Sequence, residues 1–217
     1  ELATESLPTF IAALPDFKTA LKNPTTIFYS VILHADKRIK DLADDFRKGS
    51  VFIVTGEKNE GKTSLVKKIA NEAKEKSINV GGILSEKIMK NSECVGYDVV
   101  DIRSGEKSHF LIKGDLPDCQ KIMNFSILED GLLFGNTAIM SAMEEMEFII
   151  IDEVGLLEIE NGGWHKSILM INHFPKKTFI IVVRDIFVNE IISKYKLKVK
   201  SVVPVTSENF DIRNFEN

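Results

Sequence analysis

Cysteine is scarce in this chain of 217 residues, which contains only Cys94 and Cys119. Neither cysteine belongs to a CxxC pair, and the four histidines have no metal-ligand spacing, so the sequence predicts free thiols and no structural zinc site. No apolar run approaches the ~18 residues needed to span a bilayer, and no segment resembles a signal peptide. These absences predict a cytoplasmic protein that does not contact the membrane.

An excess of positive charge is also missing. Lysine and arginine number 28 against 32 acidic residues, which gives a formal net charge of −4. A general nucleic-acid-binding protein carries the opposite sign, because neutralising phosphates supplies most of its affinity. Hydrophobic residues make up 44% of the chain and charged residues 28%. This balance excludes intrinsic disorder and predicts one soluble α/β domain, with room for an appendage.

Glycine does not occur before Gly49, which sets the first 49 residues apart from the rest. Apolar residues recur there at helical spacing, and Gly49 suits the left-handed position that ends many helices. We therefore expect an N-terminal helical extension over residues 1–49, followed by the main domain over residues 50–217. Two interpretations of the extension stay open: it packs on the main domain, or it is an arm that binds a protein partner.

After Gly49, short apolar runs typical of strands alternate with amphipathic stretches typical of helices. Strands are expected over residues 51–55, 80–89, 95–103, 107–112, 148–152, 177–184 and 199–205. Helices are expected over residues 62–76, 133–146, 164–173 and 185–195. Ser104-Gly105 predicts a hairpin turn. This alternation predicts an α/β fold, with a mostly parallel sheet flanked by helices and a β-hairpin insertion.

A glycine-rich phosphate-binding loop is the strongest chemical signal. The segment from Gly56 to Thr63 matches the pattern GxxxxGK[ST] in full, between an apolar strand and an amphipathic helix. In this motif, known as Walker A, backbone N–H groups and the helix N-terminus hold the phosphates. The lysine reaches the β- and γ-oxygens, and the threonine hydroxyl binds Mg²⁺. The predicted nucleotide-binding residues are Gly56, Glu57, Lys58, Asn59, Glu60, Gly61, Lys62, Thr63 and Ser64.

A second motif, a candidate Walker B strand, supports the first. The apolar run from Phe148 to Ile151 ends in Asp152 and Glu153. A buried parallel strand delivers residues at its carboxyl end, where open α/β sheets bind their ligands. We therefore expect Asp152 to join Thr63 at a Mg²⁺ ion, and Glu153 to orient or deprotonate the attacking water. Alone such a pair of carboxylates is a weak signal, but after a phosphate loop it is a strong one.

At these motifs the sequence resembles the P-loop nucleoside-triphosphatases of the THEP type, within the RecA-like class. The resemblance covers roughly residues 50 to 205, in four stretches that read VTGEKNEGKTSL, GGILSE, VGYDV and IDEVGLLE. It implies a RecA-like P-loop fold and slow Mg²⁺-dependent hydrolysis of several nucleoside triphosphates. The chain departs from these relatives after Glu86, where they commonly carry arginine and this sequence reads Lys87-Ile88-Met89-Lys90. A lysine replaces such a cationic contact only in part.

Two further residues are candidates for catalysis. Arg184 follows an apolar strand, so we expect it at the sheet edge that holds the phosphates, where a cation stabilises transferred charge. A solvated ion pair with Asp185 or Glu190 is an equal alternative for Arg184. Glu86 is expected at a strand end, either near the water that attacks the γ-phosphate or as an ordinary strand-terminal charge. The predicted catalytic set is therefore Lys62, Glu153, Glu86 and Arg184.

The predicted function is Mg²⁺-dependent hydrolysis of ATP, GTP and other nucleoside triphosphates, with low base selectivity. A nucleoside or nucleotide kinase is the first alternative, but such enzymes usually place several arginines over the phosphates, and only Arg103 lies between the two motifs. A nucleotide-dependent switch is the second, although the Asn-Lys-x-Asp motif of Ras-like GTPases is absent. Product analysis distinguishes the three functions.

Overall fold

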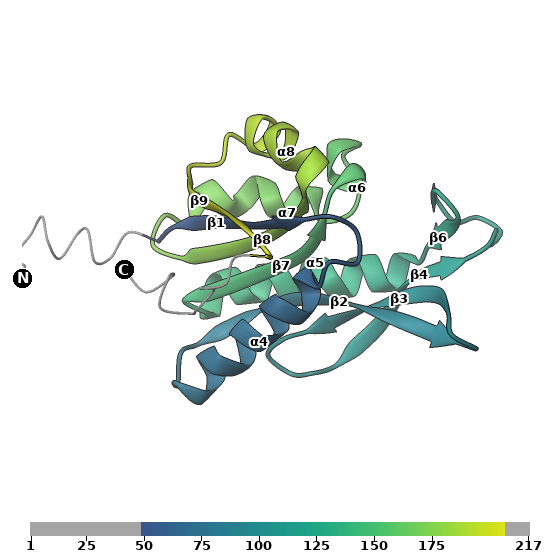
Figure 1. Ribbon diagram of the computed structural model, residues 1–217, viewed down its shortest axis with the longest axis horizontal. Helices are drawn as coiled ribbons and strands as arrows, with labels where there is room; N and C mark the ends of the chain where they lie inside the picture. The colour runs from purple at the N-terminus through teal and green to yellow at the C-terminus, as the bar shows by residue number, and fades with distance from the viewer. Residues whose placement is uncertain (1–48, 207–217) are drawn as a thin grey trace, which may run out of the picture. The chain divides into compact units, whose positions relative to one another are not determined.

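The computed structural model describes residues 49–206, and the predicted N-terminal helical extension lies outside that part of the chain. A nine-stranded sheet in the order β5-β6-β4-β3-β2-β7-β8-β1-β9 forms its centre (Figure 1). The strands are β1 (Val51–Gly56), β2 (Val80–Lys90), β3 (Glu93–Asp101), β4 (Lys107–Lys113), β5 (Lys121–Ile122), β6 (Phe125–Ile127), β7 (Phe148–Val154), β8 (Thr178–Arg184) and β9 (Val199–Pro204). The helices are α4 (Lys62–Glu75), α5 (Glu129–Glu145), α6 (Leu156–Ile159), α7 (His165–Met170) and α8 (Val188–Tyr195), with 3₁₀ turns at Ile171–His173 and Asp185–Phe187.

The sheet is mixed, where the sequence predicted a mostly parallel one. Strands β2, β7, β8, β1 and β9 pair in parallel. Strands β3, β4, β6 and β5 continue the sheet with antiparallel pairings only. The connections explain the difference, because parallel neighbours need long crossovers whereas tight turns join antiparallel ones. Asn91 and Ser92, both with positive φ, form the two-residue turn between β2 and β3.

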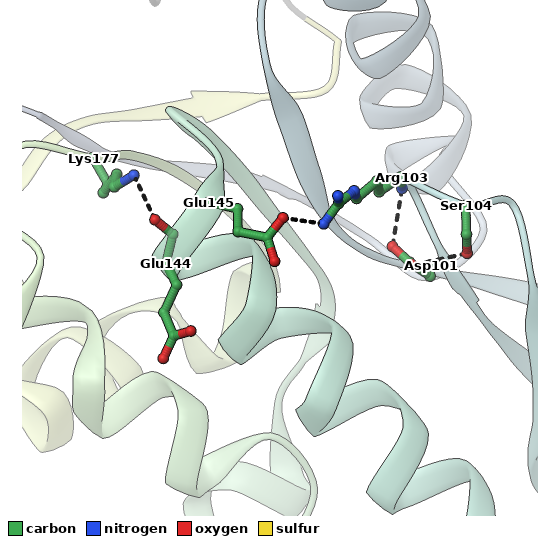
Figure 2. Close-up of polar contacts among 6 residues, drawn as sticks. All are labelled: Asp101, Arg103, Ser104, Glu144, Glu145 and Lys177. Atoms are coloured by element: carbon green, nitrogen blue, oxygen red, sulfur yellow. Dashed lines mark hydrogen bonds and ion pairs between the residues drawn. The ribbon is translucent and has the colours of Figure 1, made fainter.

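The predicted hairpin at Ser104-Gly105 is present between β3 and β4. The carboxylate of Asp101 accepts hydrogen bonds from the Arg103 N–H and the Ser104 hydroxyl, at 2.9 and 2.8 Å (Figure 2). Gly105 has a φ of +75° and donates its N–H to the Asp101 carbonyl. A glycine takes this left-handed backbone without strain, which is the property that the sequence signal rests on.

The hydrophobic core is divided between the two faces of the sheet. On one face, α4 packs Val66, Ile69 and Ala73 against the central strands. On the other, α5, α7 and α8 cover a larger apolar cluster (Figure 1). Strands β7 and β8 are buried on both faces, in keeping with their nearly continuous apolar sequences. No helix within residues 49–206 is long and apolar enough to cross a membrane.

Several elements differ from the sequence prediction. Helix α5 begins at Glu129, a few residues before the predicted start, and the predicted helix over residues 164–173 divides into α7 and a 3₁₀ turn. The short elements β5, β6 and α6 were not predicted. Runs of two to four residues are too short to show the periodicity on which such predictions depend.

Gly135 is a point of close contact between α5 and a buried aromatic side chain. A Cβ atom added there would lie 2.5 Å from two ring atoms of Trp164, whose side chain is 2% exposed. Helix propensity favours alanine over glycine by about 1 kcal/mol, but overpacking of a core typically costs about 1–3 kcal/mol. The steric effect outweighs the propensity because the contact is with a rigid, buried ring.

We therefore expect Gly135→Ala to lower the free energy of unfolding by about 1–2 kcal/mol. Equilibrium urea denaturation of the variant and the wild-type chain measures the difference. Leu133→Ala is the matched control, because Leu133 lies on the same helix and is 67% exposed. A Gly135→Ala variant more stable than wild type would contradict the packing described for Trp164.

Candidate functional site

The predicted phosphate loop connects β1 to α4. Gly56 ends β1 with a φ of +155°, and Gly61 precedes α4 with a φ of +97°. A Cβ atom on Gly56 would lie 2.4 Å from the Glu60 carboxylate and 2.9 Å from Val205. The loop therefore needs both glycines, one for close approach and one for a left-handed backbone. The N–H groups at the start of α4 point toward the loop, as a helix N-terminus must.

Polar groups of the loop bind one another. The Nζ atom of Lys62 donates hydrogen bonds to the carbonyl oxygens of Gly56, at 2.8 Å, and of Glu57. The Glu60 carboxylate accepts the N–H of Glu57 at 2.7 Å. Lys62 is only 7% exposed, so its ammonium group is held inside the loop. An anion that enters the loop therefore meets a lysine already directed at its centre.

Asp152 lies at the end of the apolar part of β7, as the sequence predicted, and it is fully buried. Its carboxylate accepts the backbone N–H groups of Ser85 and Glu153, both at 3.0 Å. Burial, together with the nearby carboxylate of Glu153, raises the pKa of Asp152 to about 7. Hydrogen bonds from Ser85, the Thr63 side chain and Glu153 act in the opposite direction and lower that pKa.

The pair of Thr63 and Asp152 fits a magnesium ion. Both side chains offer oxygen atoms, and their hydrogen bond places them side by side. Within residues 49–206 no group of three or more acidic, histidine or cysteine side chains forms a complete metal site. Mg²⁺ needs no such cage, because it typically binds one or two carboxylates and takes its other ligands from water and substrate phosphates.

Glu153 stands at an irregularity in the sheet. The pairing of β7 with β8 shifts register between Ile151 and Val154, and Glu153 has a left-handed backbone with a φ of +58°. This conformation strains a residue that has a side chain, and such strain concentrates at functional sites. The bulge exposes the Glu153 side chain, while Asp152 before it and Val154 after it stay buried. A β-bulge redirects a side chain in this way.

One pocket brings most of the predicted site residues together. The pocket is lined by Lys62, Thr63, Ser64, Glu86 and Glu153. Its other lining residues are Asn59, Glu60, Gly61, Lys67, Ser85, Lys87 and Tyr97. Sequence reasoning missed Lys67, Ser85 and Tyr97 as members of the site. Nothing in the local sequence marks them, because their relevance depends on how the hairpin of β2 and β3 passes beside the loop.

Glu86 lies inside β2, not at a strand end as predicted, because β2 continues to Lys90 in its hairpin with β3. Its carboxylate forms an ion pair with Lys67 of α4, at 2.5 Å. Its neighbour Lys87 donates a hydrogen bond to Asn59 Oδ1 at 2.6 Å. Lys87 is therefore in contact with the phosphate loop.

Arg184 ends β8 directly beside the phosphate loop. The parallel register of β1 and β8 places it opposite Gly56. Its guanidinium lies 6.0 Å from the centre of the Phe187 ring, and it lines the cavity that adjoins the pocket described above. Within residues 49–206 no acidic side chain forms an ion pair with it, so the alternative of a pair with Asp185 or Glu190 does not occur there.

The arginine between the two motifs is engaged elsewhere. Arg103 forms an ion pair with Glu145 at the end of α5, as Figure 2 shows. It lines neither the pocket over the phosphate loop nor the cavity beside it. The site therefore draws its positive charge from lysines and from Arg184.

A buried carboxylate, that of Glu158, fixes the segment after β7. It accepts the N–H groups of Gly155 at 2.7 Å and Trp164 at 2.9 Å, and it is 2% exposed. Burial raises the pKa of Glu158 to about 7, while the hydrogen bonds from these N–H groups lower it. The hydroxyl of Tyr195 donates to the Glu158 carbonyl at 2.9 Å. This network ties the backbone that follows Glu153 to α7 and α8.

A family model described as NTPase matches residues 51–216 of this chain. Among curated relatives, the nucleoside-triphosphatase THEP1 of Methanocaldococcus jannaschii is 30% identical over 109 residues, which are 50% of this chain and 63% of that protein. That of Methanopyrus kandleri is 25% identical over 112 residues, which are 52% of this chain and 61% of that protein. The chain thus spans about three fifths of the length of these curated relatives.

Two solved structures share the fold. The crystal structure of THEP1 from Aquifex aeolicus superposes with a TM-score of 0.61 at 20% identity, covering 77% of this chain and 99% of the other. The solution structure of a human cancer-related nucleoside triphosphatase gives a TM-score of 0.59 at 21% identity, covering 74% and 90%. Since the family model matches well over half of the sequence, this chain belongs to that NTPase family, as a P-loop protein of the THEP1 type.

Proposed function

We propose that this chain hydrolyses nucleoside triphosphates to diphosphate and phosphate, with Mg²⁺ as cofactor and ATP and GTP among its substrates. The observation that carries the proposal is the convergence of Lys62, Thr63, Asp152 and Glu153 at the carboxyl edge of the parallel strands. This edge is where open α/β sheets bind their ligands. The names of the relatives support the same activity.

Each residue has a distinct part in this mechanism. The loop N–H groups and the start of α4 bind the phosphate oxygens, and Lys62 exchanges its two carbonyl acceptors for β- and γ-oxygens. Thr63 and Asp152 would hold Mg²⁺, which neutralises charge on the phosphates when bound. Glu153 has its carboxylate exposed toward the pocket and accepts the proton of the attacking water. Arg184 stabilises charge on the transferred group.

Water is the proposed acceptor, in preference to a second phosphorylated substrate. Nucleotide kinases gather arginines over the phosphates. Of the two arginines within residues 49–206, Arg103 is paired with Glu145 and Arg184 alone borders the site. A chromatographic analysis of products separates the alternatives: free phosphate from hydrolysis, a phosphorylated acceptor from a kinase, and neither from a switch. We further propose a cytoplasmic location, and that residues 1–49 are an N-terminal extension that either packs on the main domain or binds a protein partner.

Substitution of Lys62 or Thr63 tests the whole proposal. Lys62→Ala removes the ammonium group directed into the loop, and Thr63→Ala removes a metal ligand, so both should abolish Mg²⁺-dependent phosphate release. The matched control is Lys68→Ala on the same helix, because the Lys68 side chain is 70% exposed and forms an ion pair with Glu72 of the same helix. Circular dichroism verifies that the variants fold. Wild-type-like phosphate release from Lys62→Ala would refute the assignment.

Glu153→Gln separates chemistry from binding. Glutamine keeps the shape of the side chain but accepts no proton, so we expect kcat to fall by roughly 10²- to 10⁴-fold while nucleotide affinity changes little. Steady-state phosphate release gives kcat, and titration calorimetry gives the affinity. Glu160→Gln serves as control, since Glu160 is an exposed carboxylate in the same segment. If Glu153→Gln stays within a few-fold of wild type, Glu86 becomes the next candidate for the base.

Low base selectivity is the third testable part of the proposal. Backbone N–H groups and Lys62 contact phosphates, which are common to all nucleotides. Strong discrimination requires buried donors and acceptors matched to one base edge. We expect the short polar residues Ser201, Thr206, Ser207 and Asn209 near the base; the first two are exposed, and the other two lie outside the described residues. We therefore expect kcat/KM for ATP and GTP to differ by less than about tenfold, or ~1.4 kcal/mol. A preference above a hundredfold for either purine, in a direct competition assay, would contradict this expectation.

A further inference from the structure

An aromatic cavity adjoins the phosphate pocket, and its apolar walls have no role in the proposed hydrolysis. We call it the aromatic chamber; it is lined by Tyr97, Phe110, Leu111, Ile122, Phe125 and Phe187, among others. Its walls come from segments that are distant in sequence. Strands β3, β4, β5 and β6 supply one side, and the segments that follow β7 and β8 supply the other.

The chamber is continuous with the phosphate pocket. The residues that line both spaces include Asn59, Lys62, Ser85, Tyr97 and Glu153. Tyr97 stands at this boundary and packs edge-on against Phe125, with 5.5 Å between the ring centres. A molecule in the chamber therefore lies next to the residues that act on the terminal phosphate, without needing to occupy the loop.

The polar rim of the chamber is predominantly positive. Lys58, Lys87 and Arg184 line it, against the single exposed carboxylate of Glu153. Glu158 also lines the chamber, but both of its carboxylate oxygens accept backbone N–H groups. The hydroxyl of Tyr97, whose pKa burial raises to about 12, is neutral and adds no negative charge. These cations complement an anionic group.

We propose that the aromatic chamber binds a second small molecule beside the nucleotide, with a planar ring system and an anionic group. Aromatic side chains favour flat apolar ligands through offset and edge-on packing. A mostly apolar cavity with a few converging polar groups is the usual form of a small-molecule site. The ring system packs among Phe110, Phe125 and Phe187, and the anionic group faces Arg184 and Lys58.

The base of the bound nucleotide is the competing occupant. Glu153 and Arg184 line the chamber, and the proposed function places both residues at the γ-phosphate. In a nucleoside triphosphate the base lies at the opposite end from that phosphate. This step rests on the proposed function, so the experiment must show whether nucleotide and second ligand bind together. It must also give a readout that does not depend on hydrolysis.

The protein contains a convenient reporter. Trp164 is the single tryptophan of the chain, it is 2% exposed, and its ring centre lies 4.7 Å from that of Phe110 in the chamber wall. The probe is 8-anilinonaphthalene-1-sulfonate, an aromatic anion that absorbs where tryptophan emits. Titration of the full chain with this probe, excited through Trp164, should give saturable energy transfer with one binding site.

Two variants test the chamber from its apolar and its charged side. Phe125→Ala removes part of the aromatic wall in a short strand, and Arg184→Gln removes a cation from the rim. Each should weaken probe binding at least tenfold. Met89→Ala is the control, because Met89 is 55% exposed on β2 and does not line the chamber. Thermal melts verify folding, and Arg184→Gln keeps the test valid if Phe125→Ala is unstable.

Saturating ADP with Mg²⁺ decides between the two occupants. Probe affinity within about threefold of its value without ADP supports a separate chamber. Three outcomes would overturn the proposal: competitive displacement of the probe by ADP, absence of one-site probe binding, or unchanged probe affinity in Phe125→Ala. Unchanged probe affinity in Arg184→Gln would refute the proposed anionic group of the ligand. Phosphate release is measured in parallel. Probe binding without hydrolysis would count against the proposed function alone, and hydrolysis without probe binding against the chamber alone.

Discussion

The buried carboxylate of Asp152 is the interaction on which the rest of the site depends. A carboxylate at 0% exposure is stable only if hydrogen bonds replace its lost solvation. Ser85 supplies one N–H from β2, at the point where that strand leaves its parallel pairing with β7 and enters the antiparallel hairpin. Glu153 supplies the other. One side chain thus links the parallel strands, the hairpin and the left-handed residue beside it.

Glu153 is positioned from both directions along the chain. Before it, the bulge between Ile151 and Val154 interrupts pairing with β8. After it, Glu158 holds the N–H of Gly155 and connects this segment to the N-terminus of α7 through Trp164. A strained backbone persists only when its surroundings hold it in place. The hydrogen bonds of buried Glu158 hold this backbone in place, so the exposed carboxylate of Glu153 extends from a fixed segment and not from a free loop.

The sequence was sufficient to predict where the residues of its local motifs lie. Gly56, Lys62 and Thr63 follow from one contiguous pattern, and Asp152 follows from an apolar run that ends in a carboxylate. It was not sufficient for Tyr97 or for the chamber wall. The positions of Tyr97 and of the chamber wall depend on which strands become neighbours in the sheet. The wall also includes β5 and β6, which are too short to show periodicity. The prediction that Glu86 lies at a strand end was wrong for a similar reason, because a hairpin with β3 continues β2 beyond its parallel pairing with β7.

The two kinds of strand pairing separate two tasks. Parallel strands bring their carboxyl ends to one edge, which collects the phosphate loop, Asp152 and Arg184 from distant parts of the sequence. Of the antiparallel strands, β3 contributes Tyr97 to the pocket over the phosphate loop. Strands β4, β5 and β6 instead form a wall of apolar side chains beside it. Lys62 and Asp152 are held by backbone groups of the parallel half and of Ser85, not by side chains of β4, β5 or β6. Substitutions in those strands can therefore reshape the chamber while leaving the phosphate-binding geometry in place.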